Sequence, residues 1–131
     1  MKRLPLALLI CTALASRAAA AETVVLEGVK TEWQNLYGAI VYAASATAHN
    51  RGAAPVRAVK VRLALYDKDG KLVVQREGYN LAAESLEDTP GGLAKVKPIP
   101  PGGSDPVRLS LDKSDIGKPF RTATLTVIET Q

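Results

Sequence analysis

The clearest pattern in the chain is an alternation over residues 59–66, in which every second residue is a valine or a leucine. Side chains on a β-strand point to opposite faces in turn, so this pattern predicts a half-buried strand. One face carries Val59, Val61, Leu63 and Leu65, and the other carries Lys60, Arg62, Ala64 and Tyr66. The polar stretch Asp67-Lys68-Asp69-Gly70 follows, with a glycine suited to a positive φ. Residues 71–79 then return as the partner strand, which makes the segment a β-hairpin.

Strands are also predicted over residues 23–30, 39–49, 107–111 and 120–129, the first as a short strand near an edge from its β-branched residues and the others from similar alternation. In the first of these, Gly28 is expected to mark a bulge. In the second and third, the residues expected to face the core are Ile40, Tyr42, Ala44, Ala46 and Ala48, and Val107, Leu109 and Leu111. In the last, Ala123, Leu125 and Val127 are expected to face inward, and Thr122, Thr124 and Thr126 outward. A row of threonines is typical of a solvated sheet face.

Three stretches lack alternation. Residues 31–38 are expected to form a loop or a single helical turn that ends at Gly38, and residues 50–55 to form a turn. Residues 81–103 are long for a loop, so a short element is expected inside them, either a helical turn over 82–86 or an edge strand near 93–96. About seven short strands without an amphipathic helix predict an all-β fold, namely a two-sheet antiparallel sandwich, with a small barrel as the alternative.

One segment of the predicted hairpin also resembles a known family. Leu63-Ala64-Leu65-Tyr66-Asp67, followed by Asp69-Gly70-Lys71, is similar to the signature of FxLYD domains, with Leu63 in place of the phenylalanine. Asn50 and the turn at 101–104 agree with that family's flanking turns, so the resemblance covers about residues 40–111. It implies a small immunoglobulin-like β-sandwich of exported bacterial proteins, and it carries over no catalytic residue.

The first 20 residues are expected to be a secretory signal peptide. Lys2 and Arg3 precede an apolar run over residues 4–15, and Ala18-Ala19-Ala20 provides a cleavage pattern of small residues. A lipid anchor at Cys11 is the competing interpretation, but Leu9-Ile10 lacks the small residue that such a cleavage site requires. The apolar run is too short to span a bilayer as a helix. The mature protein is therefore expected to be one domain over residues 21–131, periplasmic or secreted, without a transmembrane segment.

Removing this leader changes the charge and the chemistry of the chain. Three of the positive charges behind the formal net charge of +4 lie in the leader, so the mature chain carries about +1. Its lysines and arginines are interspersed with acids, which argues against nucleic-acid binding. The only cysteine leaves with the leader, so the mature chain has no disulfide and no thiolate nucleophile.

No residue pattern predicts catalysis, a cofactor or a metal site. His49 is the only histidine and has no Gly-x-Ser-x-Gly elbow to serve, so a surface imidazole is the better interpretation. Asp67 and Asp69 lack the remaining ligands of an EF-hand loop and fit a turn instead. The Gly-Gly pairs at 91–92 and 102–103 precede no helix, so they do not indicate phosphate binding. The chain is thus not expected to be an enzyme.

Trp33 and Tyr37 are the weak candidates for a binding site. Aromatic residues in a loop can stack on a sugar or anchor a protein partner, although closing one end of the sandwich is the commoner role. The first hypothesis is an exported protein-interaction module of the bacterial envelope, acting through a sheet edge, the Thr-rich face or the 81–103 loop. The alternative is a small-ligand or carbohydrate-binding module that uses the two aromatics. The partner and the oligomeric state are not specified by the sequence.

Overall fold

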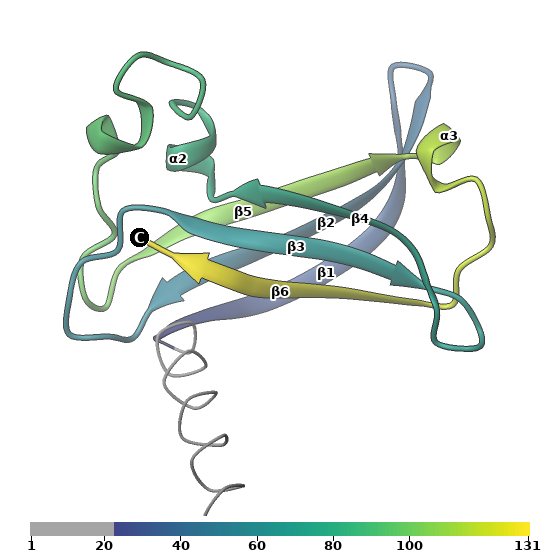
Figure 1. Ribbon diagram of the computed structural model, residues 1–131, viewed down its shortest axis with the longest axis horizontal. Helices are drawn as coiled ribbons and strands as arrows, with labels where there is room; N and C mark the ends of the chain where they lie inside the picture. The colour runs from purple at the N-terminus through teal and green to yellow at the C-terminus, as the bar shows by residue number, and fades with distance from the viewer. Residues whose placement is uncertain (1–22) are drawn as a thin grey trace, which may run out of the picture.

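A computed structural model describes residues 23–131 (Figure 1). The predicted signal peptide over residues 1–20 lies outside the described residues. Within them there are six strands and three short helical segments. The strands are β1 (Val24–Leu36), β2 (Ala39–Asn50), β3 (Val59–Tyr66), β4 (Leu72–Tyr79), β5 (Ser104–Asp112) and β6 (Thr122–Thr130). The helical segments are α2 (Leu81–Glu84), the 3₁₀ helix η1 (Gly92–Lys95) and α3 (Lys113–Ile116).

The strands form two antiparallel sheets of three strands each. Their orders are β1-β2-β5 and β4-β3-β6, and Figure 1 shows the second sheet lying in front of the first. At the edges, β5 contacts β4 and β1 contacts β6. The predicted all-β, two-sheet antiparallel fold is confirmed, with six strands among residues 23–131 where about seven were predicted. In this part of the chain no helix has the length and apolar character needed to cross a membrane.

The predicted central hairpin is present as β3 and β4. The inward side chains of β3 are fully buried: Val59, Val61, Leu63 and Leu65. Gly70 has a φ of +78°, as its place in the turn requires. The Asp67 Oδ1 atom accepts hydrogen bonds from the backbone N–H groups of Asp69 and Lys71, both at 2.9 Å. Asp67 therefore works as a turn residue in this structure.

The core lies between the inward faces of the two sheets. Val107, Leu109 and Leu111 of β5 are buried, and so are the three alanines of β2 that were predicted to be inward: Ala44, Ala46 and Ala48. The inward side chains of β6 pack against this core, whereas its threonines at 122, 124 and 126 are exposed. Gly78 of β4 allows the sheets to approach at the β4–β5 edge, because a Cβ atom there would lie 2.5 Å from Leu109 Cδ2.

The prediction of a loop over residues 31–38 is wrong. After the bulge at Gly28, where φ is +63°, β1 continues to Leu36 and pairs with β2 along its length. Tyr37 and Gly38 form the turn, and only Val41 and later residues of β2 pair with β5. Ile40 was predicted to be buried but is 42% exposed, because the hairpin extends beyond the end of β5. Val41, on the opposite face of β2, is buried instead.

The irregular segment after β4 has its own small core. The helical turn predicted over residues 82–86 is present as α2 over 81–84, but residues 92–95 form η1, so the edge-strand alternative near 93–96 is wrong. Ala58, Ala83 and Val96 are buried together beneath this segment. The predicted long loop is therefore packed around a core of its own at one end of the sandwich, at the upper left of Figure 1.

Two buried asparagines fix the connections at this end. Asn50 Nδ2 donates to the carbonyl groups of Ala54 (2.9 Å) and Ile99 (3.0 Å), and Asn50 Oδ1 accepts from Gly52 N–H (2.9 Å). Asn80 Oδ1 accepts from Val59 N–H, and Asn80 Nδ2 donates to Asp105. Both side chains are fully buried, so these bonds satisfy their polar groups and hold the turns against the sheets.

Candidate functional site

The first candidate residue, Trp33, lies on β1 opposite Tyr42 of β2. Its ring centroid is 5.2 Å from that of Tyr42 and 5.9 Å from that of Phe120, and the Tyr42 and Phe120 centroids are 4.8 Å apart. Phe120 precedes β6, so this aromatic cluster (Trp33, Tyr42 and Phe120) joins the two sheets. Trp33 keeps 48% of its surface exposed, which means that it both packs and remains accessible.

A wide hollow borders the aromatic cluster. It measures about 750 Å³ and is lined by Trp33 together with residues of α3 and of the segment after it, including Lys113 and Lys118. Tyr42 Oη donates to Thr31 Oγ1 at 2.9 Å, which fixes the tyrosine ring at its edge. Within residues 23–131 neither lysine forms an ion pair. The hollow thus combines an aromatic wall with two lysines and the carboxylate of Glu32.

The second candidate residue, Tyr37, lies at the tip of the β1–β2 hairpin and is fully exposed. Its φ of +53° is in the left-handed region, and the turn is closed by Asn35 Oδ1, which accepts from Gly38 N–H at 2.9 Å. No aromatic contact joins Tyr37 to Trp33 in the described part of the chain. The structure therefore places the two predicted residues in separate surroundings on the same hairpin.

Exposed apolar side chains are concentrated on this hairpin. Among the described residues seven large hydrophobic side chains are exposed, and five of them belong to the β1–β2 hairpin: Val29, Trp33, Leu36, Tyr37 and Ile40. We call Leu36, Tyr37 and Ile40, which surround the turn, the hairpin surface. The tip of the hairpin rises beside α3 and past the end of β5 in Figure 1. By the register of the hairpin, Leu36 lies on its outer face and Ile40 on the opposite face with Trp33, so the hairpin presents apolar side chains to solvent on both faces.

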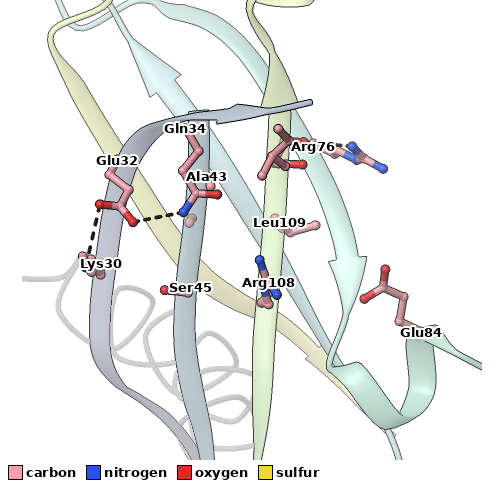
Figure 2. Close-up of a pocket in the computed structure, with 12 residues that line it drawn as sticks. Lys30, Glu32, Gln34, Ala43, Ser45, Arg76, Glu84, Arg108 and Leu109 are labelled. Carbon is pink, nitrogen blue, oxygen red and sulfur yellow. Dashed lines mark hydrogen bonds and ion pairs between the residues drawn. The ribbon is translucent and has the colours of Figure 1, made fainter. Parts of the chain in front are cut away.

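A polar groove runs along the outer face of the β1-β2-β5 sheet (Figure 2). Its floor is β2, where Ala43 and Ser45 are short, and its volume is about 390 Å³. Three β1 side chains form one wall: Lys30 Nζ lies 3.7 Å from Glu32 Oε2, and Gln34 Nε2 donates to Glu32 Oε1 at 3.0 Å. Leu36 of the hairpin surface also lines the groove. We call this feature the outer groove.

The opposite wall of the outer groove carries two arginines. Arg108 projects from β5 in Figure 2, and Arg76 of β4 lies on the far side, where its Nη1 atom donates to the Ser110 carbonyl at 2.8 Å. Neither arginine pairs with a carboxylate in residues 23–131. Glu84 of α2 also lines the groove. No sequence pattern marked this site, because its residues come from five elements, β1, β2, β4, α2 and β5, that only the folded structure brings together.

The outer face of the other sheet differs in its electrostatics. There Arg62 donates to Glu77 Oε2 at 2.7 Å and 3.1 Å, and Lys60 lies 3.6 Å from Glu77 Oε1. The hydrogen bond from Arg62 holds the pKa of the Glu77 carboxyl below its usual value. On the first sheet, at the end of β5, the hydrogen bond from Ser114 N–H likewise lowers the pKa of the Asp112 carboxyl. Unpaired arginines thus distinguish the outer groove from the outer face of the second sheet.

These features define a two-sheet antiparallel β protein with an apolar hairpin and a polar groove on one sheet. A family described as proteins of unknown function (DUF3426) matches residues 18–119. The chain belongs to this family. Searches of curated proteins and of solved structures each found no match. The resemblance to FxLYD domains is not tested by these comparisons and stays a prediction.

Proposed function

We propose that the protein is a non-enzymatic protein-binding module of the bacterial envelope that contacts its partner through the β1–β2 hairpin. The observation that carries the proposal is that five of the seven exposed large hydrophobic side chains in residues 23–131 lie on this hairpin. Trp and Tyr are among them, and these residues dominate the binding energy of protein interfaces. The exported location rests on the predicted leader, and the immunoglobulin-like character on the FxLYD resemblance.

Site-specific crosslinking in the exporting cell tests this proposal. A photoreactive amino acid at position 37 is expected to give adducts of defined mass, because Tyr37 is fully exposed at the tip. The same amino acid at position 124, which is exposed on β6, is the control. Adducts that disappear when Leu36 and Ile40 are both changed to Ser support the hairpin as the contact. Equal adducts from positions 37 and 124, or none from either, would overturn the proposal.

A second candidate function is binding of a carbohydrate or another small ligand at the aromatic cluster. It is favoured by the exposure of Trp33, which presents part of its ring to the hollow beside Lys113 and Lys118. Soluble oligosaccharides of N-acetylglucosamine are then expected to quench the fluorescence of Trp33 in a saturable way. Tyr37→Ala should leave this quenching unchanged, since Tyr37 lies outside the cluster. Fluorescence unchanged up to millimolar sugar would count against this function.

A further inference from the structure

The outer groove has the dimensions of one extended polypeptide chain. Its floor is the single strand β2, so the backbones of the flanking strands β1 and β5 lie roughly 10 Å apart, twice the usual spacing between strands. Along β1 the wall from Lys30 to Leu36 is about 20 Å long, the length of about six extended residues. A ligand that fills the groove is therefore long and narrow.

The charged side chains of the two walls indicate on which side a ligand of the groove would carry its carboxylates. On the β1 wall, Glu32 is bound by Lys30 and Gln34, so that wall is internally neutralised. On the other wall, Arg108 has no ion pair among the described residues, and Arg76 gives one donor to the Ser110 carbonyl and has no carboxylate partner. Glu84 of α2 is the carboxylate on this side of the lining, so the two arginines leave it with a net positive charge. Planar guanidinium groups bind carboxylates with two parallel hydrogen bonds. The unsatisfied donors thus match carboxylates on the β5 side of the ligand.

We propose that the outer groove binds an extended acidic segment of a partner protein, with carboxylates on Arg108 and Arg76. The amide of Gln34 and the hydroxyl of Ser45 on the β1 and β2 side supply polar partners for a peptide backbone, and Leu36 at the end supplies an apolar contact. The described lining holds no aromatic side chain on which a sugar or a base would stack. This inference rests on the proposed protein-binding function and names the chemistry of the partner.

Selection from a displayed library of random twelve-residue peptides on the mature protein tests the inference. Enriched peptides are expected to contain two or more Asp or Glu residues and few lysines. Arg108→Gln and Arg76→Gln should each weaken their binding about tenfold, the lower range for loss of a charge-assisted hydrogen bond at an exposed site. Arg57→Gln is the matched control, because Arg57 is an exposed arginine outside the groove and should leave affinity unchanged.

The outcomes separate this inference from the proposed function. Two results would overturn the groove as the site. One is that the enriched peptides contain no Asp or Glu. The other is that Arg108→Gln and Arg76→Gln bind acidic peptides as tightly as the control Arg57→Gln does. Peptides that lose affinity with Tyr37→Ser and keep it with Arg108→Gln bind at the hairpin tip, which overturns the groove and supports the protein-binding module. If Arg76→Gln lowers the melting temperature, Arg76→Lys, which keeps the charge, is measured beside it. Failure to enrich any peptide overturns the inference.

Discussion

Replacing Asn50 with alanine tests whether buried polar contacts hold one end of the sandwich. The change removes three side-chain hydrogen bonds. The Ile99 carbonyl keeps a partner in Val56 N–H, but the Gly52 N–H and the Ala54 carbonyl lose their side-chain partner. Each partly buried group left unsatisfied costs about 1–2 kcal/mol, so the free energy of unfolding should fall by about 2–4 kcal/mol. For a domain of this size that lowers the melting temperature by about 8–16 °C.

Asn35→Ala is the matched control for this experiment. Asn35 also accepts a turn hydrogen bond, from Gly38 N–H, but at an exposed site where water replaces it. Its loss should therefore cost about 1 kcal/mol or less. Circular dichroism melting curves of the two variants give the comparison. Equal shifts for the two variants, or no shift for Asn50→Ala, would refute the reasoning that burial sets the cost.

Asn50→Asp gives a second readout of the same contacts. One carboxylate oxygen of the new side chain would face the carbonyl groups that Asn50 Nδ2 now binds, in a fully buried position. Burial and these oxygens disfavour the charged form and raise its pKa in the folded state. Such a group destabilises the fold increasingly as pH rises above the unfolded carboxyl pKa of about 3.9. The variant should therefore be more stable, relative to the wild type, at pH 4 than at pH 7.

Three further predictions follow from single features of the fold. Gly70→Val should lower the free energy of unfolding by about 1 kcal/mol or more, because φ is +78° there, and an unchanged melting temperature would contradict the turn. Gly78→Ala should lower the free energy of unfolding by about 1–3 kcal/mol, because the new methyl group overlaps Leu109, and by less when Leu109 is also changed to Ala. If the effects of the two substitutions simply add in a double-mutant cycle, the two residues are not in contact. Arg62→Gln should raise the pKa of Glu77, measured by NMR titration. The low pKa of this carboxyl adds stability at neutral pH that is lost as the solution is acidified through it, so a titration unchanged by the substitution would exclude the pair.

The sequence predicts the strands that bury one face and expose the other. Val107 to Leu111 on β5 alternate because the strand has the other sheet on one side and solvent on the other. β3 follows the same pattern except at Ala64, which was predicted to face outward but is buried. The Gly70 turn was predictable from local chemistry alone, since its glycine and Asp67 act within five residues. In these strands and in the turn, the residues that determine the local structure are therefore close together in the sequence.

The hairpin could not be predicted in the same way. Residues 31–36 form a regular strand, yet Glu32, Trp33 and Leu36 are all exposed. Glu32 is on the outer face of the sheet, Trp33 is only partly covered by the aromatic cluster, and Leu36 lies beyond the end of β5, so neither face of this strand is fully covered. Without burial of one face there is no period of two in the sequence. The placement of Ile40 failed for the same reason: the alternation of β2 was correct, but the layer that would have covered Ile40 is missing at that point.

The candidate sites depend even more on long-range pairing. Trp33 and Tyr37 were predicted as one pair, whereas the register of β1 places Trp33 beside Tyr42 and Phe120 and leaves Tyr37 at the tip. The outer groove joins β1, β2 and β5 through pairings such as Ser45 with Arg108. These residues are distant in the chain, and none of them is unusual by itself. Only the order of strands in the sheet reveals that they share a surface.

The bulge at Gly28 separates two parts of β1 that differ in their burial. Before it, Val24 is buried and Leu26 packs against the core, so their amides should exchange with solvent only when the whole domain unfolds. After it, residues 30–36 contribute little to the core and can open locally at a small fraction of that cost. Substitutions of Leu36 and Tyr37 at the tip are therefore expected to leave folding largely unchanged, whereas Trp33 is tied to the core through Tyr42 and Phe120. The exposed residues of the tip can vary while the sandwich beneath them stays intact.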